Sequence, residues 1–438
     1  MPFFRRLFSI SALFCLLVSP VYAQQFLTDM MDTTTTLGKG YYSIFQRYDQ
    51  LRFTGYVQPQ YQWASDKGAK VPAAGDFGPY TNSRFMLRRS RLRADYVVRR
   101  ADKQPVTHFV LQLDATEKGV FARDVWGRYF ENRWSMLSFT AGLFARPFGY
   151  EVNLSSADRE APERGRASQI LMRTERDLGI MASFEPRGTY LKRFNWLRFD
   201  AGIFNGQGLT APTDYDSHKD VIGRLYVRPA NGFKNGWRLS GGVSYLYGGI
   251  FNPSGKLFTA SGSGTTAIMT VDSPAADIAK RRYLGADLQL RIPNSKGATE
   301  FRAEYIRGLQ TGIAGSSETP TTLTNSTGVP VPLYTRQFDA AYFYFLQNLG
   351  SPRHQLVLKY DWYDPNVALS GKDVAPGRGF SGADISYHTL GGGYVWYASP
   401  HLKATLWYDH VRNESTDLPG FTDDISDDVF TARLQYRF

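Results

Sequence analysis

Residues 429–438 read Val-Phe-Thr-Ala-Arg-Leu-Gln-Tyr-Arg-Phe, and this stretch decides how the rest of the chain is interpreted. Side chains of one kind fall on every second position. The apolar set is Phe430, Ala432, Leu434, Tyr436 and Phe438. The polar set is Thr431, Arg433, Gln435 and Arg437. Because successive side chains of a β-strand point to opposite faces, the alternation predicts a strand with one apolar and one polar face.

The same alternation recurs along the chain from residue 51 onward. A scan for period-two segments bounded by turn residues finds about 16 of them, most of them about 9–12 residues long. The segments lie near 51–63, 84–99, 107–115, 121–130, 135–145, 176–185, 196–204, 219–228, 236–247, 281–291, 299–308, 334–346, 353–363, 384–397, 402–411 and 427–438. This length is what a tilted strand needs to cross a lipid bilayer.

The links between these segments alternate in length. The short links are 100–106, 131–134, 186–195, 229–235, 292–298, 347–352 and 398–401. The long links are 64–83, 146–175, 205–218, 248–280, 309–333, 364–383 and 412–426, with 116–120 a short exception. Short periplasmic turns and long extracellular loops are typical of transmembrane barrels. We therefore predict an all-β fold, a transmembrane antiparallel β-barrel of about 16 strands over residues 51–438.

The composition supports a barrel. Aromatic residues make up 15% of the chain and its mean hydropathy is −0.35, values that aromatic outer belts and a polar lumen produce together. Beyond residue 23, no stretch approaches the roughly 18 consecutive apolar residues of a helical span. The formal net charge of +11 suggests anionic partners, and we predict small anions such as phosphate and no nucleic acid.

Residues 1–23 are predicted to be a signal peptide. Arg5 and Arg6 precede the apolar stretch from Leu7 to Val18, and Val21-Tyr22-Ala23 offers a cleavage site with small residues. The alternative is a retained anchor helix. Cys15, the only cysteine, lies in this segment, so a disulfide scaffold and thiolate metal sites are excluded. Residues 24–50 do not alternate, and we predict a periplasmic extension that is either loosely ordered or in contact with the lumen.

The aromatic residue at position 438 resembles the end of the last strand in bacterial outer-membrane proteins. This likeness implies that Phe438 is recognised by the barrel-assembly machinery of a Gram-negative cell. Outer-membrane lipid and lipopolysaccharide are then the expected surroundings of the barrel.

The strongest candidate for a functional feature lies on the predicted strand 84–99. Lipid-facing positions at Leu92, Ala94, Tyr96 and Val98 place Arg89, Arg91 and Arg93 in the lumen, about 6.6–6.8 Å apart along the strand. Such a ladder would pass anions from site to site, and Arg128 on strand 121–130 is predicted to join it. The alternative is that the arginines pair with carboxylates of the same face, namely Asp95, Asp114, Asp124, Asp200, Asp287, Glu304 and Asp409. Arg88 should face outward, near the outer rim.

The long link 146–175 is the second candidate. Loops of this length are usually functional or disordered, and in a barrel the expected role is to fold inward as a constriction. Arg146, Arg164 and Arg166 are predicted to line the solute path there. Asp158, Arg159, Glu160 and Glu163 interleave with them, so self-pairing within the segment is the alternative.

Several motifs between residues 84 and 185 occur in an order and spacing that resemble the phosphate-selective porin O and P family. They are Arg88-Arg89-Ser90-Arg91-Leu92-Arg93, Arg123-Asp124-Val125-Trp126, Gly142-Leu143-Phe144-Ala145-Arg146-Pro147-Phe148-Gly149-Tyr150-Glu151, Ser155, Glu163-Arg164, Arg173 and Asp177-Leu178-Gly179. The resemblance implies a 16-stranded barrel, commonly a homotrimer, with its third extracellular loop (146–175 here) folded inward. It also implies basic residues along the anion path. Phosphate-selective members carry lysine on that loop, whereas residues 146–175 contain none, so we predict a preference for small anions with phosphate as one candidate.

The remaining motifs point to no chemistry. Gly391-Gly392-Gly393 predicts close strand packing, and the six scattered histidines have no ligand spacing, so we predict no metal site, cofactor or catalytic residue. The leading function is passive diffusion of small hydrophilic solutes through a porin. The alternatives are a structural or adhesive barrel with a closed lumen, and an outer-membrane barrel enzyme.

Overall fold

A closed antiparallel barrel forms the described part of the chain. The computed structural model describes residues 50–71, 74–187, 192–230, 235–272 and 274–438. Residues Phe53–Phe438 form one compact unit, which contains the barrel apart from the first two residues of its first strand. The predicted signal peptide 1–23 lies outside the described residues, as does the predicted extension 24–50 except for its last residue.

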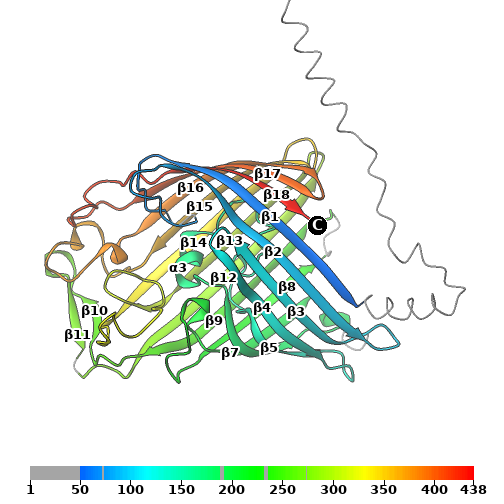
Figure 1. Cartoon of the computed structure of the whole chain (residues 1–438), viewed down its shortest axis with the longest axis horizontal. Coiled ribbons are helices and arrows are strands. Elements are labelled where there is room, and N and C mark those ends of the chain that lie inside the picture. The colour runs from blue at the N-terminus through cyan, green and yellow to red at the C-terminus, as the bar shows by residue number, and fades with distance from the viewer. Residues whose placement is uncertain (1–49, 72–73, 188–191, 231–234, 273) are drawn as a thin grey trace, which may run out of the picture. The chain divides into compact units, whose positions relative to one another are not determined.

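Of 18 strands in the described residues, two form a separate hairpin, which leaves 18 − 2 = 16 in the barrel wall. The wall strands are β1 (Leu51–Ala64), β2 (Ser83–Arg99), β3 (Pro105–Thr116), β4 (Gly119–Phe130), β5 (Leu137–Ala145), β6 (Arg176–Phe184), β7 (Leu197–Phe204), β8 (Asp220–Ala230), β9 (Arg238–Phe251), β12 (Ile278–Asn294), β13 (Gly297–Gly312), β14 (Leu333–Asn348), β15 (His354–Asp364), β16 (Tyr387–Ser399), β17 (Leu402–Asn413) and β18 (Val429–Arg437). Each pairs with its neighbours, and β1 pairs with both β2 and β18, which closes the ring (Figure 1). The predicted fold is confirmed.

Burial follows the predicted alternation, with the apolar side chains outside. On β12, Leu284 and Leu288 are 47% and 54% exposed, whereas Tyr283 and Asp287 are 1% and 8% exposed. The interior is rich in buried polar groups, as on β1, where Gln58, Gln60 and Gln62 face inward. This arrangement inverts that of a soluble protein, in which apolar side chains fill the interior.

The long link 248–280 contains a β-hairpin that the sequence analysis treated as loop. Strands β10 (Leu257–Ser261) and β11 (Ile268–Asp272) pair with each other, and β10 also pairs in parallel with the start of β14. At 5 residues each, the strands are too short to cross a bilayer, so they extend one edge of the wall without adding to the ring (Figure 1). An apolar cluster of Ala267, Met269, Leu369, Val374, Phe380 and Ile385 packs the hairpin against the long link before β16.

Helices are few and short. They are α3 (Arg166–Leu171) and the 3-10 turns Lys192–Phe194, Gly208–Thr210, Gly264–Thr266, Gly371–Asp373 and Gly382–Asp384. No helix in the described ranges is long and apolar enough to cross a membrane. The triple glycine of β16 does mark close strand packing, because the Trp407 indole lies against Gly391 and Gly393 where a Cβ would otherwise sit.

Candidate functional site

The segment 146–175 lies inside the barrel and contacts inward-facing side chains of many wall strands. Backbone N–H groups of Tyr150 and Glu151 donate to Glu304 of β13 at 3.2 and 3.1 Å, and the N–H of Arg166 donates to Asp361 of β15 at 3.1 Å. Lys403 of β17 donates to the carbonyls of Ala157 and Arg159 at 2.7 and 2.9 Å. Inward-facing polar groups of the wall therefore form hydrogen bonds with backbone groups of the segment. A buried segment without regular secondary structure requires such partners.

Glu163 is the centre of the ion pairs that hold this segment. Its carboxylate accepts hydrogen bonds from Arg88 at 2.9 Å, Arg89 at 2.7 Å and Arg433 at 2.9 Å, and Glu163 is 6% exposed. Burial alone would raise the pKa of Glu163, but Arg88, Arg89 and Arg433 outweigh it and hold the pKa well below its usual range. One charged carboxylate thus ties strands β2 and β18 to the segment.

The predicted outward position of Arg88 is wrong. Phe85 and Leu92 both face outward, at 86% and 45% exposure, although they are seven positions apart. An odd separation requires one extra residue in the strand between them, as in a β-bulge. Arg88 and Arg89 are neighbours in the strand, yet both bind Glu163, which strict alternation cannot anticipate.

The three arginines of the predicted ladder face the lumen, and each is ion-paired. Arg89 binds Glu163, Arg91 binds Asp114 at 2.9 Å, and Arg93 binds Asp95 at 2.8 Å. Arg89 and Arg91 are also buried. The geometry therefore favours the pairing alternative for these two, while Arg93 opens onto a cavity described below.

The three predicted arginines of the segment differ in their surroundings. Arg146 is buried and donates to the carbonyl of Thr174, so it joins the two ends of the segment. Arg164 is buried, pairs with Glu175 and donates to the carbonyl of Glu151 at 3.0 Å. Arg166 stacks on the ring of Tyr387 at 3.6 Å. Ion pairing within the segment thus accounts for Arg164, whereas Arg146 binds a backbone carbonyl and Arg166 lies 3.9 Å from Asp427, outside the segment.

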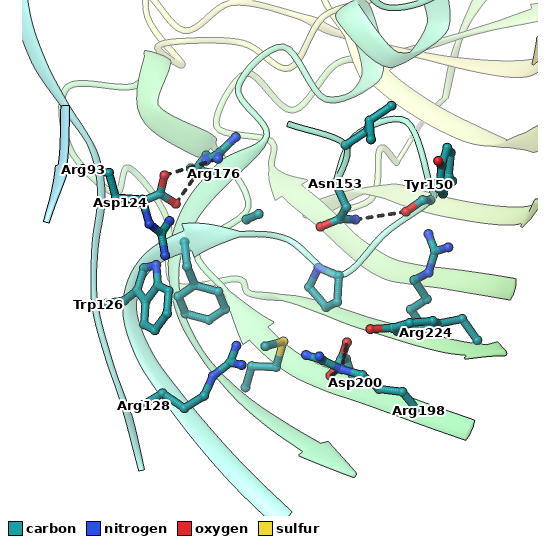
Figure 2. Close-up of a pocket in the computed structure, with 17 residues that line it drawn as sticks. Arg93, Asp124, Trp126, Arg128, Tyr150, Asn153, Arg176, Arg198, Asp200 and Arg224 are labelled. Carbon is teal, nitrogen blue, oxygen red and sulfur yellow. Dashed lines mark hydrogen bonds and ion pairs between the residues drawn. The ribbon is translucent and has the colours of Figure 1, made fainter. Parts of the chain in front are cut away.

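A basic cavity of about 380 Å³ lies between the start of the segment and the wall strands β2 and β4–β8 (Figure 2). We call it the arginine cavity. Five arginines line it, one each from β2, β4, β6, β7 and β8: Arg93, Arg128, Arg176, Arg198 and Arg224. Two aspartates, Asp124 and Asp200, also line it, so the formal charge of its lining is 5 − 2 = +3.

The arginines of this cavity are not equally neutralised. Arg176 pairs with Asp124 at 3.2 Å, Arg198 with Asp200 at 3.0 Å and Arg224 with Asp287 at 2.8 Å. Arg128 donates through Nε to the Thr140 hydroxyl at 2.8 Å and has no carboxylate partner within the described part of the chain. Arg128 is therefore the arginine of the cavity whose positive charge is least neutralised.

A second basic cavity, of about 740 Å³, lies toward the long loops. Its lining includes the cations Lys70, Arg88, Arg89, Arg91, Arg123, Arg164, Arg166 and Arg173, and the carboxylates of Asp76, Asp114, Glu163, Glu175 and Glu318. Arg123 pairs with Asp114 and Glu175, and Glu175 also pairs with Arg176 of the arginine cavity. Alternating charges thus connect the two cavities along the wall.

Arg176, Arg198 and Arg224 are not among the residues that the sequence predicts on the solute path. A usable signal exists for two of them, because Asp200 lies directly opposite Arg224 in the β7–β8 register and Arg198 shares the inward face of Asp200. Among the described residues, no group of three or more His, Cys, Asp or Glu side chains could hold a metal ion.

Comparisons with known proteins bear on the fold. No family model matches the chain, and no curated protein does. The solved structure of OprB from Pseudomonas putida is similar with a TM-score of 0.55 at 8% identity, over 92% of this chain and 98% of that chain. A loop-deletion mutant of OmpT, an outer membrane protein of Vibrio cholerae, is similar with a TM-score of 0.50 at 11% identity, over 89% and 99%. At such identities the likeness shows the barrel fold alone, and it gives no support to the phosphate-selective family in particular.

Proposed function

We propose that this chain is an outer-membrane porin through which small hydrophilic solutes diffuse passively, with a preference for anions. The outward face of the wall is apolar and the ring is closed, so a lipid bilayer would leave no strand edge unpaired. The alternation of apolar outer and polar inner residues supports the same placement.

The observation that carries the anion preference is the unequal pairing in the arginine cavity. Four of the five arginines there pair with an aspartate, whereas Arg128 has no carboxylate partner in the described ranges. A cation in a low-dielectric wall raises the local concentration of anions and repels cations. A lumen in which every arginine was neutralised would have little such preference.

The test is the reversal potential of the folded protein in a planar bilayer under a KCl gradient. A unit charge about 8 Å from a permeating ion in water-like surroundings contributes about 0.5 kcal/mol. This changes the permeability a little over twofold for each sign of ion, and salt screening reduces the effect. We therefore expect Arg128→Met to lower the anion/cation ratio by about two- to fivefold at low salt.

The matched control is Arg282→Met. Arg282 is exposed on the outward face of β12, over the ring of Tyr247, so its loss removes the same charge without changing the lumen. Equal effects of the two variants would refute a lumen origin of the selectivity. Well-folded protein without conductance would instead favour a structural or adhesive barrel with a closed lumen, and lipase or protease activity would favour a barrel enzyme.

Further parts of the proposal concern export, assembly and phosphate. Residues 1–23 act as the signal peptide, Phe438 is read by the barrel-assembly machinery, and the barrel forms a homotrimer among lipid and lipopolysaccharide. Chemical cross-linking in membranes tests the trimer, and N-terminal sequencing of the mature protein tests the cleavage after Ala23. Block of the chloride current by low phosphate concentrations would support phosphate as a natural solute.

A further inference from the structure

The arginine cavity has an apolar side as well as a basic one. Phe144 and Met181 line it from β5 and β6 although both point inward, where the alternation otherwise places polar groups. Trp126, Pro147 and Leu154 continue this side. Figure 2 shows the labelled Trp126 beside Arg93 and Arg128, at the edge of the same cavity.

Two arginines of the cavity have side-chain N–H groups without a hydrogen-bond partner among the described residues. The Nη groups of Arg128 have no hydrogen-bond partner among the described residues, since only Nε is bound, to Thr140. Arg224 is 7% exposed, and its Nη1 is buried without a partner in the same part of the chain, while Nη2 binds Asp287. Because Nη1 of Arg224 has almost no accessible surface, the Nη groups of Arg128 are the donors that a ligand bringing an acceptor can reach.

An aromatic ring lies beside each of these two arginines. The guanidinium of Arg128 lies 5.3 Å from the ring of Trp126, and that of Arg224 lies 5.2 Å from the ring of Tyr226. Each cation–π contact keeps its arginine beside an aromatic surface. An anion bound between the arginines would therefore have rings within reach of the rest of its structure.

A fully hydrated inorganic anion does not suit such a site. Phosphate presents oxygens on all sides, and those turned toward Phe144 and Met181 would lose water without gaining a hydrogen bond. A carboxylate attached to a small apolar body places its oxygens on the arginines and its carbon skeleton on the apolar side. The cavity volume of about 380 Å³ is within the range of small-molecule sites.

We propose that the arginine cavity is a binding site for small organic carboxylates with a planar or apolar body. The inference rests on the proposed function, because it names the class of solute that this part of the lumen selects. Arg128 holds the carboxylate, and Trp126, Phe144 and Met181 contact the body.

Binding and conductance are tested separately, with benzoate as the probe and with acetate, phosphate and neutral benzamide for comparison. Binding is measured by saturation-transfer NMR on the full-length folded protein in detergent, which does not depend on an open pore. Block of the KCl current is then measured in planar bilayers. We expect benzoate to bind and to block at concentrations about tenfold lower than acetate or phosphate, because only benzoate buries an aromatic ring. Benzamide should have no effect.

Two variants separate the two parts of the site. Arg128→Met should abolish benzoate binding, whereas Met181→Gln should weaken benzoate about tenfold toward the level of acetate and leave acetate unchanged. Arg282→Met, on the outer face, should behave as the parent protein. Because Arg128 and Met181 take part in no ion pair, loss of folding is not expected, and heat-modifiable migration on gels checks it.

The outcomes distinguish this inference from the proposed function. Benzoate binding without conductance would retain the site and overturn the porin. An anion-selective pore to which benzoate binds no better than acetate, or to which phosphate binds more tightly, would overturn the site and retain the porin. Benzoate binding that persists in Arg128→Met would place the ligand elsewhere and also overturn the inference.

Discussion

Glu163→Gln removes the charge at the contact that ties the inward segment to three arginines. Arg88, Arg89 and Arg433 all bind this carboxylate within 2.9 Å. Removing one partner of a buried ion pair costs about 3–5 kcal/mol, and here one change leaves three guanidiniums uncompensated, so we take about 4 kcal/mol. At about 1.4 kcal/mol per factor of ten, the ratio of docked to undocked segment falls about 700-fold.

The assay combines single-channel recording with limited trypsin digestion of the folded barrel. Glu163→Gln should show larger and noisier conductance and rapid cleavage within 146–175. The control is Glu160→Gln in the same segment, because Glu160 pairs with a single arginine, Arg302, at 2.8 Å. It should change both readouts less.

The pH dependence follows from the direction of the pKa shift. The pKa of Glu163 lies well below its ordinary value, because the neighbouring arginines outweigh burial. Its contribution to docking is therefore complete above its ordinary pKa and is lost only as the pH falls through the lowered value. Protease resistance of the segment should be flat from pH 7 to 5. Unchanged noise and cleavage in Glu163→Gln, or an equal effect of Glu160→Gln, would refute the role assigned to Glu163.

Three further predictions concern other parts of the barrel. Burial raises the pKa of Asp427 to about 6, against the opposing effect of Arg166, which lies 3.9 Å away. Protonation below about pH 6 should therefore stabilise the fold, release Arg166 and raise the anion/cation permeability ratio. Asp427→Asn should show the high ratio at pH 7 and no step in a pH series of reversal potentials. Arg159 is 4% exposed and none of its side-chain nitrogens has a partner among the described residues, so Arg159→Met should raise the melting temperature, with a gain of about 1–4 kcal/mol, and a lower melting temperature would count against it. A Cβ at Gly393 would lie 2.5 Å from a β17 carbonyl and 2.4 Å from the Trp407 ring, so Gly393→Val should cost about 1–3 kcal/mol and reduce the folded yield measured by gel migration.

The wall of the barrel could be predicted from the sequence because each strand is specified by the alternation of its own side chains. A strand between lipid and lumen must alternate, and the alternation at 282–292 or 429–438 is visible without knowing any neighbour. The exceptions have causes that act over longer distances. The 257–272 hairpin pairs with β14, which follows it by about 60 residues, and Arg88 binds Glu163, 75 residues away.

The same distinction limits what could be predicted about the site. Alternation places Arg89, Arg91, Arg93 and Arg128 on the inward face, but it cannot say which carboxylate neutralises which arginine. That depends on the path of 146–175, whose Glu163 neutralises Arg89, and on cross-strand pairs such as Arg91–Asp114. The register of the β7–β8 hairpin likewise brings Asp200 directly opposite Arg224.

The selectivity of such a lumen therefore depends less on how many arginines it holds than on which of them lack a carboxylate. The carboxylates of the segment 146–175 pair with the arginines nearest to the segment. Glu163 pairs with arginines of β2 and β18, Glu160 with an arginine of β13, and Glu175 with an arginine of β4. Within the described residues, no carboxylate of the segment pairs with Arg128, and Arg224 pairs with Asp287 of β12. The segment thus lies in the lumen and pairs its carboxylates with arginines of β2, β4, β6, β13 and β18, whereas Arg128 has no carboxylate partner in the described part of the chain. A variant that adds a carboxylate near Arg128, such as Thr140→Glu, should for this reason reduce anion preference as much as removing Arg128 does, although the number of arginines is unchanged.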